Sequence, residues 1–310
     1  MRILILMVNV KVGVIAPVIT IWSFIKAMSQ ESSIHAKNPG AAQDLVQARY
    51  QQAAFIPDEV NATIETMFTH RSVRAYTDEA LKPGTLELLV AAAQSASTSS
   101  NLQTWSVVAV QDAARKDRLA QLAGNQEHIR RCPLFLVWVA DLSRLKMLGV
   151  KRGVAHDGLT YMEAFLVAAI DSALAAQNAA VAAESMGLGV VYIGGMRNHP
   201  EQVAKELGLP EYAFATFGMC IGYPDPLKPA SVKPRLPQAA VLHKEQYDAS
   251  ALEASAQSYN ATMDEFYKAQ GMKNNGPWDL HSLNRIRGPE ALTGRHRLVE
   301  ALNNLGFKLR

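Results

Sequence analysis

The stretch LAAQNAAVAAESMGLGVVYIGGMRN, residues 174–198, decides how this chain folds. It closes a long apolar run that begins at residue 159 and carries three charged side chains: Glu163, Asp171 and Glu184. Alanine favours helix, and glycine directly after the last turn is a common helix end. We therefore predict one long helix over Leu159–Met186, followed by a strand over Gly189–Gly195 that stops at paired glycines.

The predicted helix is apolar around nearly its whole circumference. Such a helix has to be covered on most sides, and its small residues allow neighbouring elements to approach closely. Two places satisfy this requirement: the centre of a domain, or an interface between subunits. The pattern of the helix leaves both open.

Both strands and helices are predicted along the rest of the chain. Runs rich in β-branched and aromatic residues predict strands at 105–110, 134–140 and 213–223. Helical spacing predicts a short helix at 200–207 and a longer one at 252–270. These elements predict a fold of mixed helix and strand built around one dominant helix.

The glycines of this chain do not form a dinucleotide fingerprint. That motif needs a strand before the glycines and a helix after them, whereas Gly187 and Gly189 follow the predicted helix and precede a strand. A Rossmann fold is excluded by this order.

Two basic strings are the strongest sign of a ligand. His70-Arg71-Ser72-Val73-Arg74 is separated by about 160 residues from Lys233-Pro234-Arg235. Arginine offers a planar fork of donors that matches phosphate oxygens, and lysine adds a point charge. Alone, the first string is a weak signal, and a solvated helix start explains it better; together, the two predict an anion clamp.

Two further features suit a bound ligand, although each has an ordinary alternative. Ser97, Thr98 and Ser99 either form a flexible loop or offer hydroxyl and N–H groups to phosphate and polyol oxygens. Gly194 and Gly195 either form a tight turn or let the backbone approach a flat ligand.

Composition sets limits on the partners. The chain has 310 residues, 49% apolar and 19% charged, which is typical of a packed globular protein. A net charge of +3 gives no reason to expect nucleic acid. Cys132 and Cys220 lie in apolar surroundings without a CxxC pattern, so we predict buried, unpaired thiols, no metal site and a cytoplasmic location.

The N-terminal 59 residues form a separate extension in this interpretation. Ile3–Ile25 is long enough to span a membrane and carries one charge, Lys11, but lacks the cleavage site of a signal peptide. It is either a membrane anchor or an artefact of a start codon upstream of Met28. Residues 30–54 are polar and weakly patterned, as in a linker, so we place the folded domain at 60–310.

The C-terminal residues from His281 carry six Lys and Arg against two Glu. This composition predicts a solvated arm.

Several strings, in this order, resemble the flavin-dependent nitroreductase superfamily, in its NADPH-dependent oxygen-insensitive nitroreductase and flavin oxidoreductase branch. They are IETMFTHRSVRAYTDE, SASTSSNLQ, LAGNQ, LAAQNAAVAAESMGLGVVYIGGMRN and VKPRLP, and the resemblance covers roughly residues 60–310. It implies an α+β fold with a central, mostly antiparallel sheet surrounded by helices. It also implies an intertwined homodimer with an FMN at each of two interface sites.

The resemblance assigns the cofactor contacts residue by residue. His70, Arg71, Lys233 and Arg235 hold the FMN phosphate, and Arg74 lies near the pyrimidine edge of the flavin, where a cation stabilises the reduced ring. The remaining contacts come from shorter motifs. Ser72, Thr98 and Ser99 contact phosphate, ribityl or ring oxygens, Gln126 contacts the polar edge of the ring, and the backbone of Ile193, Gly194 and Gly195 faces N5.

The same resemblance implies a ping-pong cycle with no catalytic side chain. NADPH gives hydride to flavin N5, NADP leaves, and a flat acceptor such as a nitroaromatic, a quinone or a free flavin takes the electrons. Related proteins often carry arginines where this chain has Lys273-Asn274-Asn275, so Lys273 is its one candidate for the NADPH 2′-phosphate, and NADH stays open.

Three alternatives remain. The first is a flavin reductase that supplies reduced FMN to a partner. The second is a flavin-binding module without turnover, attached to a membrane through residues 3–25. The third is a structural protein that binds a phosphorylated ligand.

Overall fold

A four-stranded antiparallel sheet forms the centre of the protein. The computed structural model describes residues 39–51, 55, 57, 59–274 and 276–310. The strands are β1 (Trp105–Val110), β2 (Leu134–Asp141), β3 (Gly189–Ile193) and β4 (Ala213–Gly222), in the order β1-β2-β4-β3. Every neighbouring pair is antiparallel. The predicted α+β class is confirmed.

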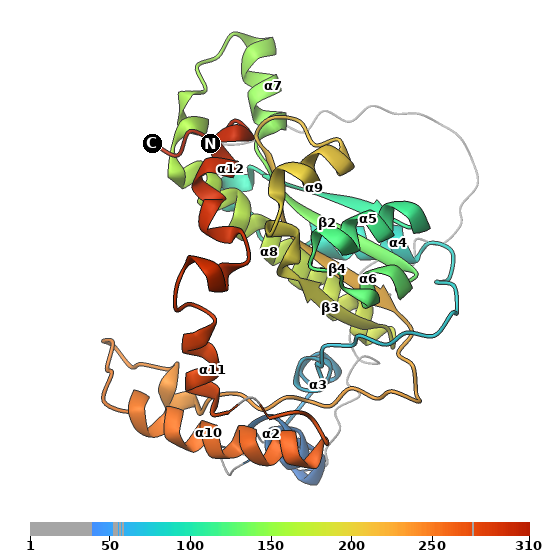
Figure 1. Ribbon diagram of the computed structural model, residues 1–310, viewed down its shortest axis with the longest axis vertical. Helices are drawn as coiled ribbons and strands as arrows, with labels where there is room; N and C mark the ends of the chain where they lie inside the picture. The colour runs from blue at the N-terminus through green and yellow to red at the C-terminus, as the bar shows by residue number, and fades with distance from the viewer. Residues whose placement is uncertain (1–38, 52–54, 56, 58, 275) are drawn as a thin grey trace, which may run out of the picture.

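Helices cover both faces of this sheet (Figure 1). On one face, α5 (Ala113–Leu122), α6 (Glu127–Arg131) and α9 (Pro200–Leu207) contribute to a core with Phe135, Val137 and Cys220. On the other, α4 (Thr85–Gln94) and α8 (Met162–Ser185) pack against Leu136, Trp138 and Met219. Alternate residues of β2 therefore enter opposite cores, as the period of two in a strand requires.

The long helix α8 begins at Met162, three residues later than predicted, because Asp157–Thr160 forms a 3₁₀ turn. Its alanines are buried against the sheet and α4, at positions 168, 175, 176, 179, 180 and 183. A second stripe, four residues apart, is exposed: Met162, Leu166, Ile170 and Leu174. By length and composition α8 qualifies as a membrane span, but its buried alanines make it the core helix of this domain.

The predicted linker is wrong for residues 39–50. They form α2 (Pro39–Tyr50), with Ala42, Val46 and Arg49 buried, and α2 contacts α3 (Ala62–Phe68). Weak patterning hid this helix, since it has only one narrow apolar side. The segment Ile3–Ile25 lies outside the described residues, and the domain boundary at residue 60 stays a prediction.

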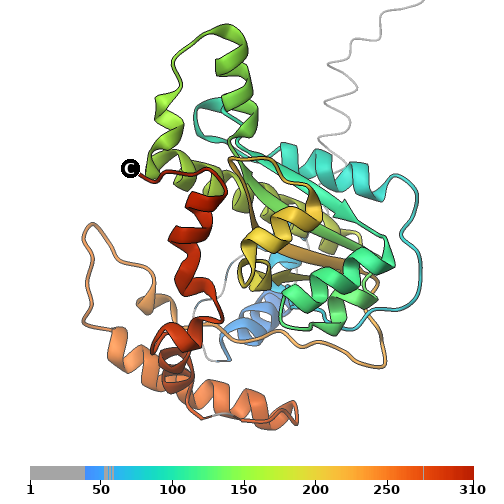
Figure 2. The ribbon, with the colours of Figure 1, turned by 45° about the horizontal axis from the view of Figure 1, so that its top comes forward.

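Beyond β4 the chain leaves the sheet. The helices α10 (Leu252–Ala269) and α11 (Trp278–Asn284) lie apart from it in both views of the ribbon (Figures 1 and 2). They share a small core of their own that includes Tyr259, Met263 and Phe266. The helix α7 (Ser143–Arg152) projects from the opposite end of the molecule (Figure 2).

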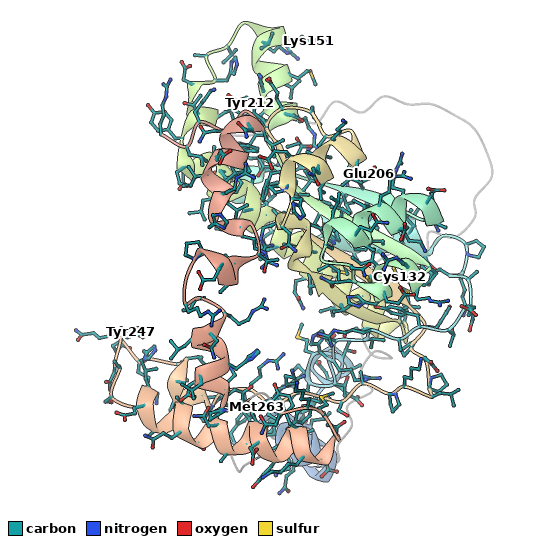
Figure 3. All side chains as sticks on the ribbon, viewed as in Figure 1. Cys132, Lys151, Glu206, Tyr212, Tyr247 and Met263 are labelled. Carbon is teal, nitrogen blue, oxygen red and sulfur yellow. The ribbon has the colours of Figure 1, made fainter. Side chains whose placement is uncertain are left out.

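The predicted solvated C-terminal arm is wrong for residues 298–310, whereas none of residues 281–297 is buried. Its last part forms α12 (Leu298–Asn304), which returns to the body near Tyr212 (Figure 3). Phe307 is 1% exposed and packs its ring against Phe165 and Tyr212. The count of charged residues misled the prediction for this part, because three buried apolar side chains, Ala301, Leu302 and Phe307, dock residues 298–310 onto the body.

Short 3₁₀ turns complete the described elements, at Ser99–Asn101, Gly194–Arg197, Gln238–Ala240, Pro289–Leu292 and Arg295–Arg297. Cys132 and Cys220 are buried and unpaired, as predicted.

Candidate functional site

The two basic strings meet in one cleft of about 340 Å³. Six of the predicted cofactor residues line it, and we call them the basic clamp: His70, Arg71, Ser72, Arg74, Lys233 and Arg235. The other lining residues are Ala75, Lys228, Pro229, Ala230, Ser231, Phe266 and Met272. The structure therefore brings together segments that are about 160 residues apart in the sequence.

The first clamp segment is held in an extended form against β3. Val73 N donates to Val190 O at 2.9 Å, and Ser72 forms a parallel bridge with Val190. Val73 is buried, so its neighbours Ser72 and Arg74 point to the opposite, exposed side. Gly189 is required here, because a Cβ on it would lie 2.7 Å from the Val73 side chain.

The second clamp segment repeats this arrangement. Pro234 is buried, and its carbonyl accepts a hydrogen bond of 2.8 Å from Tyr259 Oη of α10. Lys233 and Arg235, on either side of it, are exposed. The Lys233 ammonium lies 5.6 Å from the centre of the Tyr267 ring, a distance that permits a cation–π contact.

The clamp cations lie close enough to affect one another. Partial burial of the ammonium, and then the positive charges of Arg74 and Arg235, lower the pKa of Lys233 below its ordinary value. Burial and the charge of Arg74 also lower the pKa of His128, on α6. Arg74 thus lies within electrostatic range of both the second clamp segment and α6. An anion in the cleft relieves this mutual repulsion.

His70 is oriented by a carboxylate. Its Nδ1 lies 2.7 Å from Glu184 Oε1, near the end of α8. The Glu184 side chain is 12% exposed and the His70 side chain 28%. Because Nδ1 is occupied by Glu184, Nε2 is the ring atom that can contact a ligand.

Arg49 of α2 forms hydrogen bonds with both clamp segments. Its Nη2 donates to Phe68 O at 2.7 Å and to His70 O at 2.9 Å, and its Nη1 donates to Lys233 O at 3.1 Å. In return, Arg235 N donates to Arg49 O at 2.9 Å. Burial, and then the charge of Arg235, lower the pKa of Arg49.

A second group of predicted residues gathers at the end of β3. Gln126 Nε2 donates to Ala123 O at 2.7 Å, and a Cβ on Gly195 would lie 2.5 Å from the same oxygen. The strand ends at Ile193, so the paired glycines belong to a 3₁₀ turn rather than to the strand. Gly195 is required by its contact with Ala123, which favours the ordinary packing role over approach to a ligand.

The third group, Thr98 and Ser99, does not line the cleft. Thr98 Oγ1 donates to Asp171 Oδ2 at 2.5 Å and accepts from Gln103 N at 2.9 Å. Ser99 N donates to Asp171 Oδ1 at 3.1 Å. The only proton of the Thr98 hydroxyl is therefore committed, so toward a ligand Thr98 can act only as an acceptor.

Residues 97–104 form a loop that we call the hydroxyl loop. Asp171 accepts hydrogen bonds from both ends of this loop. It is 2% exposed and also accepts from Thr104, through N at 3.3 Å and Oγ1 at 3.0 Å. Three residues of the loop have positive φ: Ser100, Asn101 and Gln103. A buried carboxylate with four donors thus holds a loop whose backbone is otherwise unfavourable.

Lys273 is exposed and is not among the lining residues of the cleft. It directly follows Met272, which does line it. Its predicted contact with the 2′-phosphate of NADPH stays a prediction.

Comparison with known families identifies the chain. The model of the nitroreductase family matches residues 67–223, and the model of that family's C-terminal domain matches residues 233–310. The chain belongs to the nitroreductase family. The resemblance inferred from the sequence strings is confirmed.

Relatives of known name agree. The FMN reductase (NADPH) of Bacillus subtilis is 39% identical over 232 residues, which cover 74% of this chain and 92% of that protein. The NADPH-flavin oxidoreductase of Vibrio harveyi is 38% identical over 252 residues, covering 81% and 100%. The structure of the NfrA1 nitroreductase from B. subtilis has a TM-score of 0.74 at 37% identity, covering 79% of this chain and 99% of that one.

Several residues of this candidate site were not predicted from the sequence. Glu184 and Asp171 carried a signal, because they are two of the three charges in an otherwise apolar helix. The lining residues Lys228, Ser231, Phe266 and Met272 carried none, since nothing in their local pattern differs from an ordinary surface. Arg49 carried none either, because it lies in a stretch with weak patterning.

Proposed function

We propose that this protein is an FMN-dependent NADPH oxidoreductase that reduces nitroaromatics, quinones or related flat acceptors. The observation that carries the proposal is the basic clamp, in which four cationic side chains from two distant segments, Arg71, Arg74, Lys233 and Arg235, line one cleft. Membership of the nitroreductase family and the names of the relatives, which include FMN and NADPH, support the same conclusion.

The donors in the cleft suit the FMN phosphate. A phosphate monoester carries a charge of about −1.5 to −2 near neutral pH and offers three acceptor oxygens. Arg71, Lys233 and Arg235 supply charge-assisted donors, and Ser72 adds a hydroxyl. Phe266 and Met272 provide apolar surface beside them, which suits the carbon skeleton of the ligand.

The side chains bind and orient, and they carry no covalent step. When bound, FMN supplies the hydride and electron transfer for which no side chain is suited. Arg74, between the second clamp segment and α6, is placed to stabilise negative charge that develops on a ligand in the cleft. Glu184 holds the His70 ring in one orientation.

A homodimer is part of the proposal. The exposed stripe of α8 (Met162, Leu166, Ile170 and Leu174) is an apolar surface of the kind that an isologous interface buries. The separation of the hydroxyl loop from the basic clamp also supports a dimer. In a dimer, one chain can contribute its basic clamp and the other its hydroxyl loop to the same site. The family fold and the absence of disulfides among the described cysteines suit a cytoplasmic enzyme.

Flavin reduction is the second candidate function. Two relatives carry flavin reduction in their names, FMN reductase (NADPH) and NADPH-flavin oxidoreductase. In this role the protein supplies reduced FMN to another enzyme. Weak retention of FMN during purification favours this role, and tight retention favours the first.

The visible spectrum of the purified protein tests both proposals. We expect flavin bands that bleach on anaerobic addition of NADPH, more slowly with NADH, and that return when a nitroaromatic or a quinone is added. Bands that persist with both nucleotides would indicate a binding module without turnover. A protein that shows no bands after incubation with FMN would overturn the proposed function.

A further inference from the structure

We propose that Arg49 of α2 is a positioning residue that assembles the phosphate clamp of this protein. It touches neither the ligand nor the reacting atoms and acts through the two clamp segments. The inference rests on the proposed function, because it concerns the same cleft. It extends that function to a helix that precedes residue 67, where the match to the nitroreductase family begins.

The hydrogen bonds of Arg49 connect the two clamp segments. Three hydrogen bonds join this residue to the clamp segments, and a fourth joins it to Phe68, two residues before the first of them. Two come from Nη2, to the carbonyl of the last residue of α3 and to that of His70 just beyond it. One runs from Nη1 to Lys233 O, and one reaches Arg49 O from Arg235 N. Carbonyls 163 residues apart are thus fixed by one planar group.

The guanidinium group of Arg49 has a fixed, planar geometry. The guanidinium plane directs its donors along fixed directions, so the positions of its acceptors are fixed relative to one another. The side chain directions of His70 and Lys233 follow from the backbone that Arg49 holds. A lysine ammonium at the same place keeps the charge but lacks the rigid fork, and it does not impose this geometry.

The clamp gathers cations that repel one another, which opposes the close approach of its two segments. Arg49 is 8% exposed and adds a further positive charge beneath them, with Glu184 as the nearby carboxylate. A buried charge that is retained in a cationic cluster has to be stabilised by its partners, and here these are the carbonyls of the two clamp segments.

The test compares FMN with riboflavin, which lacks the phosphate, on the full chain freed of its flavin. For Arg49→Met we expect the dissociation constant of FMN to rise about tenfold or more, and that of riboflavin to stay within about twofold. Arg49→Lys should behave like Arg49→Met. Gln47→Met, at an exposed position of the same helix, is the matched control and should resemble the wild type.

The outcomes separate this inference from the proposed function. If the wild type binds FMN no better than riboflavin, the clamp itself is refuted. If the wild type prefers FMN and Arg71→Ala loses that preference while Arg49→Met keeps it, only the role of Arg49 falls. Equal weakening of both flavins, together with a lower melting temperature, indicates a structural helix anchor and overturns the inference. Full recovery by Arg49→Lys also overturns it, because charge alone then suffices.

Discussion

The basic clamp and the hydroxyl loop are both rich in polar groups, but they differ in how many of these groups form hydrogen bonds within the protein. In the hydroxyl loop, the Thr98 and Thr104 hydroxyls and three backbone N–H groups are used inside the protein, four of these five groups on the single carboxylate of Asp171. In the clamp, internal bonds from Arg49 and Tyr259 hold the backbone, and the Arg and Lys side chains stay exposed. Arg71 and Arg235 each use Nη1 on nearby backbone carbonyls, and their other guanidinium nitrogens form no hydrogen bond among the described residues. The comparison teaches that residue type alone does not mark a ligand contact: what matters is whether the donors remain free.

Both regions are attached to the same helix. Asp171 lies near the middle of α8 and Glu184 near its end, and thirteen residues of helix separate them by about 20 Å. Each carboxylate organises one region: Asp171 the hydroxyl loop, and Glu184 the ring of His70. The helix that decides the fold thus also sets the spacing between the two regions.

Removal of the loop's carboxylate should have the largest effect. Asp171→Ala leaves four donors without their partner in a buried place, so we expect the free energy of unfolding to fall by about 3 kcal/mol or more. Chemical denaturation measures this loss. Ser185→Ala, near the exposed end of the same helix, is the control. An unfolding free energy that stays within about 0.5 kcal/mol of the wild type would show that the loop does not depend on Asp171.

Substitutions in the clamp should weaken FMN binding and leave the stability of the protein nearly unchanged. Arg71→Ala and Arg235→Ala each remove an exposed cation, so we expect FMN binding to weaken by about 1.5–3 kcal/mol while stability changes by less than about 0.5 kcal/mol. Flavin fluorescence titration and thermal melting provide the two measurements. Arg152→Ala, an exposed arginine on α7, controls for loss of charge elsewhere. Unchanged FMN affinity in both clamp variants would remove the clamp from the site.

The pH dependence of FMN binding tests whether Lys233 contacts the phosphate. Its pKa in the free protein is lowered by burial, Arg74 and Arg235, and a bound phosphate should raise it again. Below the lowered pKa the ammonium is already present; above it, binding has to take up a proton, so FMN affinity should fall as the pH rises through that value. The measurement is the ratio of FMN to riboflavin affinity between about pH 7 and about pH 10. Lys233→Arg should flatten the profile, and an equal slope in wild type and variant would contradict this assignment.

The smallest effect is expected at Lys273. This side chain is exposed, so its contribution to NADPH binding should be that of a surface ion pair, about fivefold in KM or less. We expect Lys273→Ala to raise the KM for NADPH and to leave the KM for NADH unchanged. Lys151→Ala, on α7, serves as the control. A parallel change for both nucleotides would show that Lys273 does not distinguish the 2′-phosphate.

Much of this protein could be predicted from its sequence. The four strands and the α8 helix follow from local patterns, since β-branched runs, alanine content and helix-ending glycines act within a few residues. The family was identified from the resemblance of several strings in their order along the chain. The cations of the clamp were also identified, because Arg and Lys strings with proline and serine stand out from their surroundings. The errors concern segments with weak patterns: α2, which looked like a linker, and α12, which looked like a solvated arm.

The sequence by itself determined which residues carry charge in this protein and which segments become strands or the central helix. Only the tertiary structure decided which polar groups remain free. Asp171 uses the donors of Thr98 and Ser99, Ala123 explains Gly195, and Arg49 joins carbonyls that are 163 residues apart. The physical reason is that these are side chain and backbone contacts between distant segments, and any residue has a carbonyl and almost any has an N–H. Such partners leave no pattern in the sequence and exist only once the chain is folded.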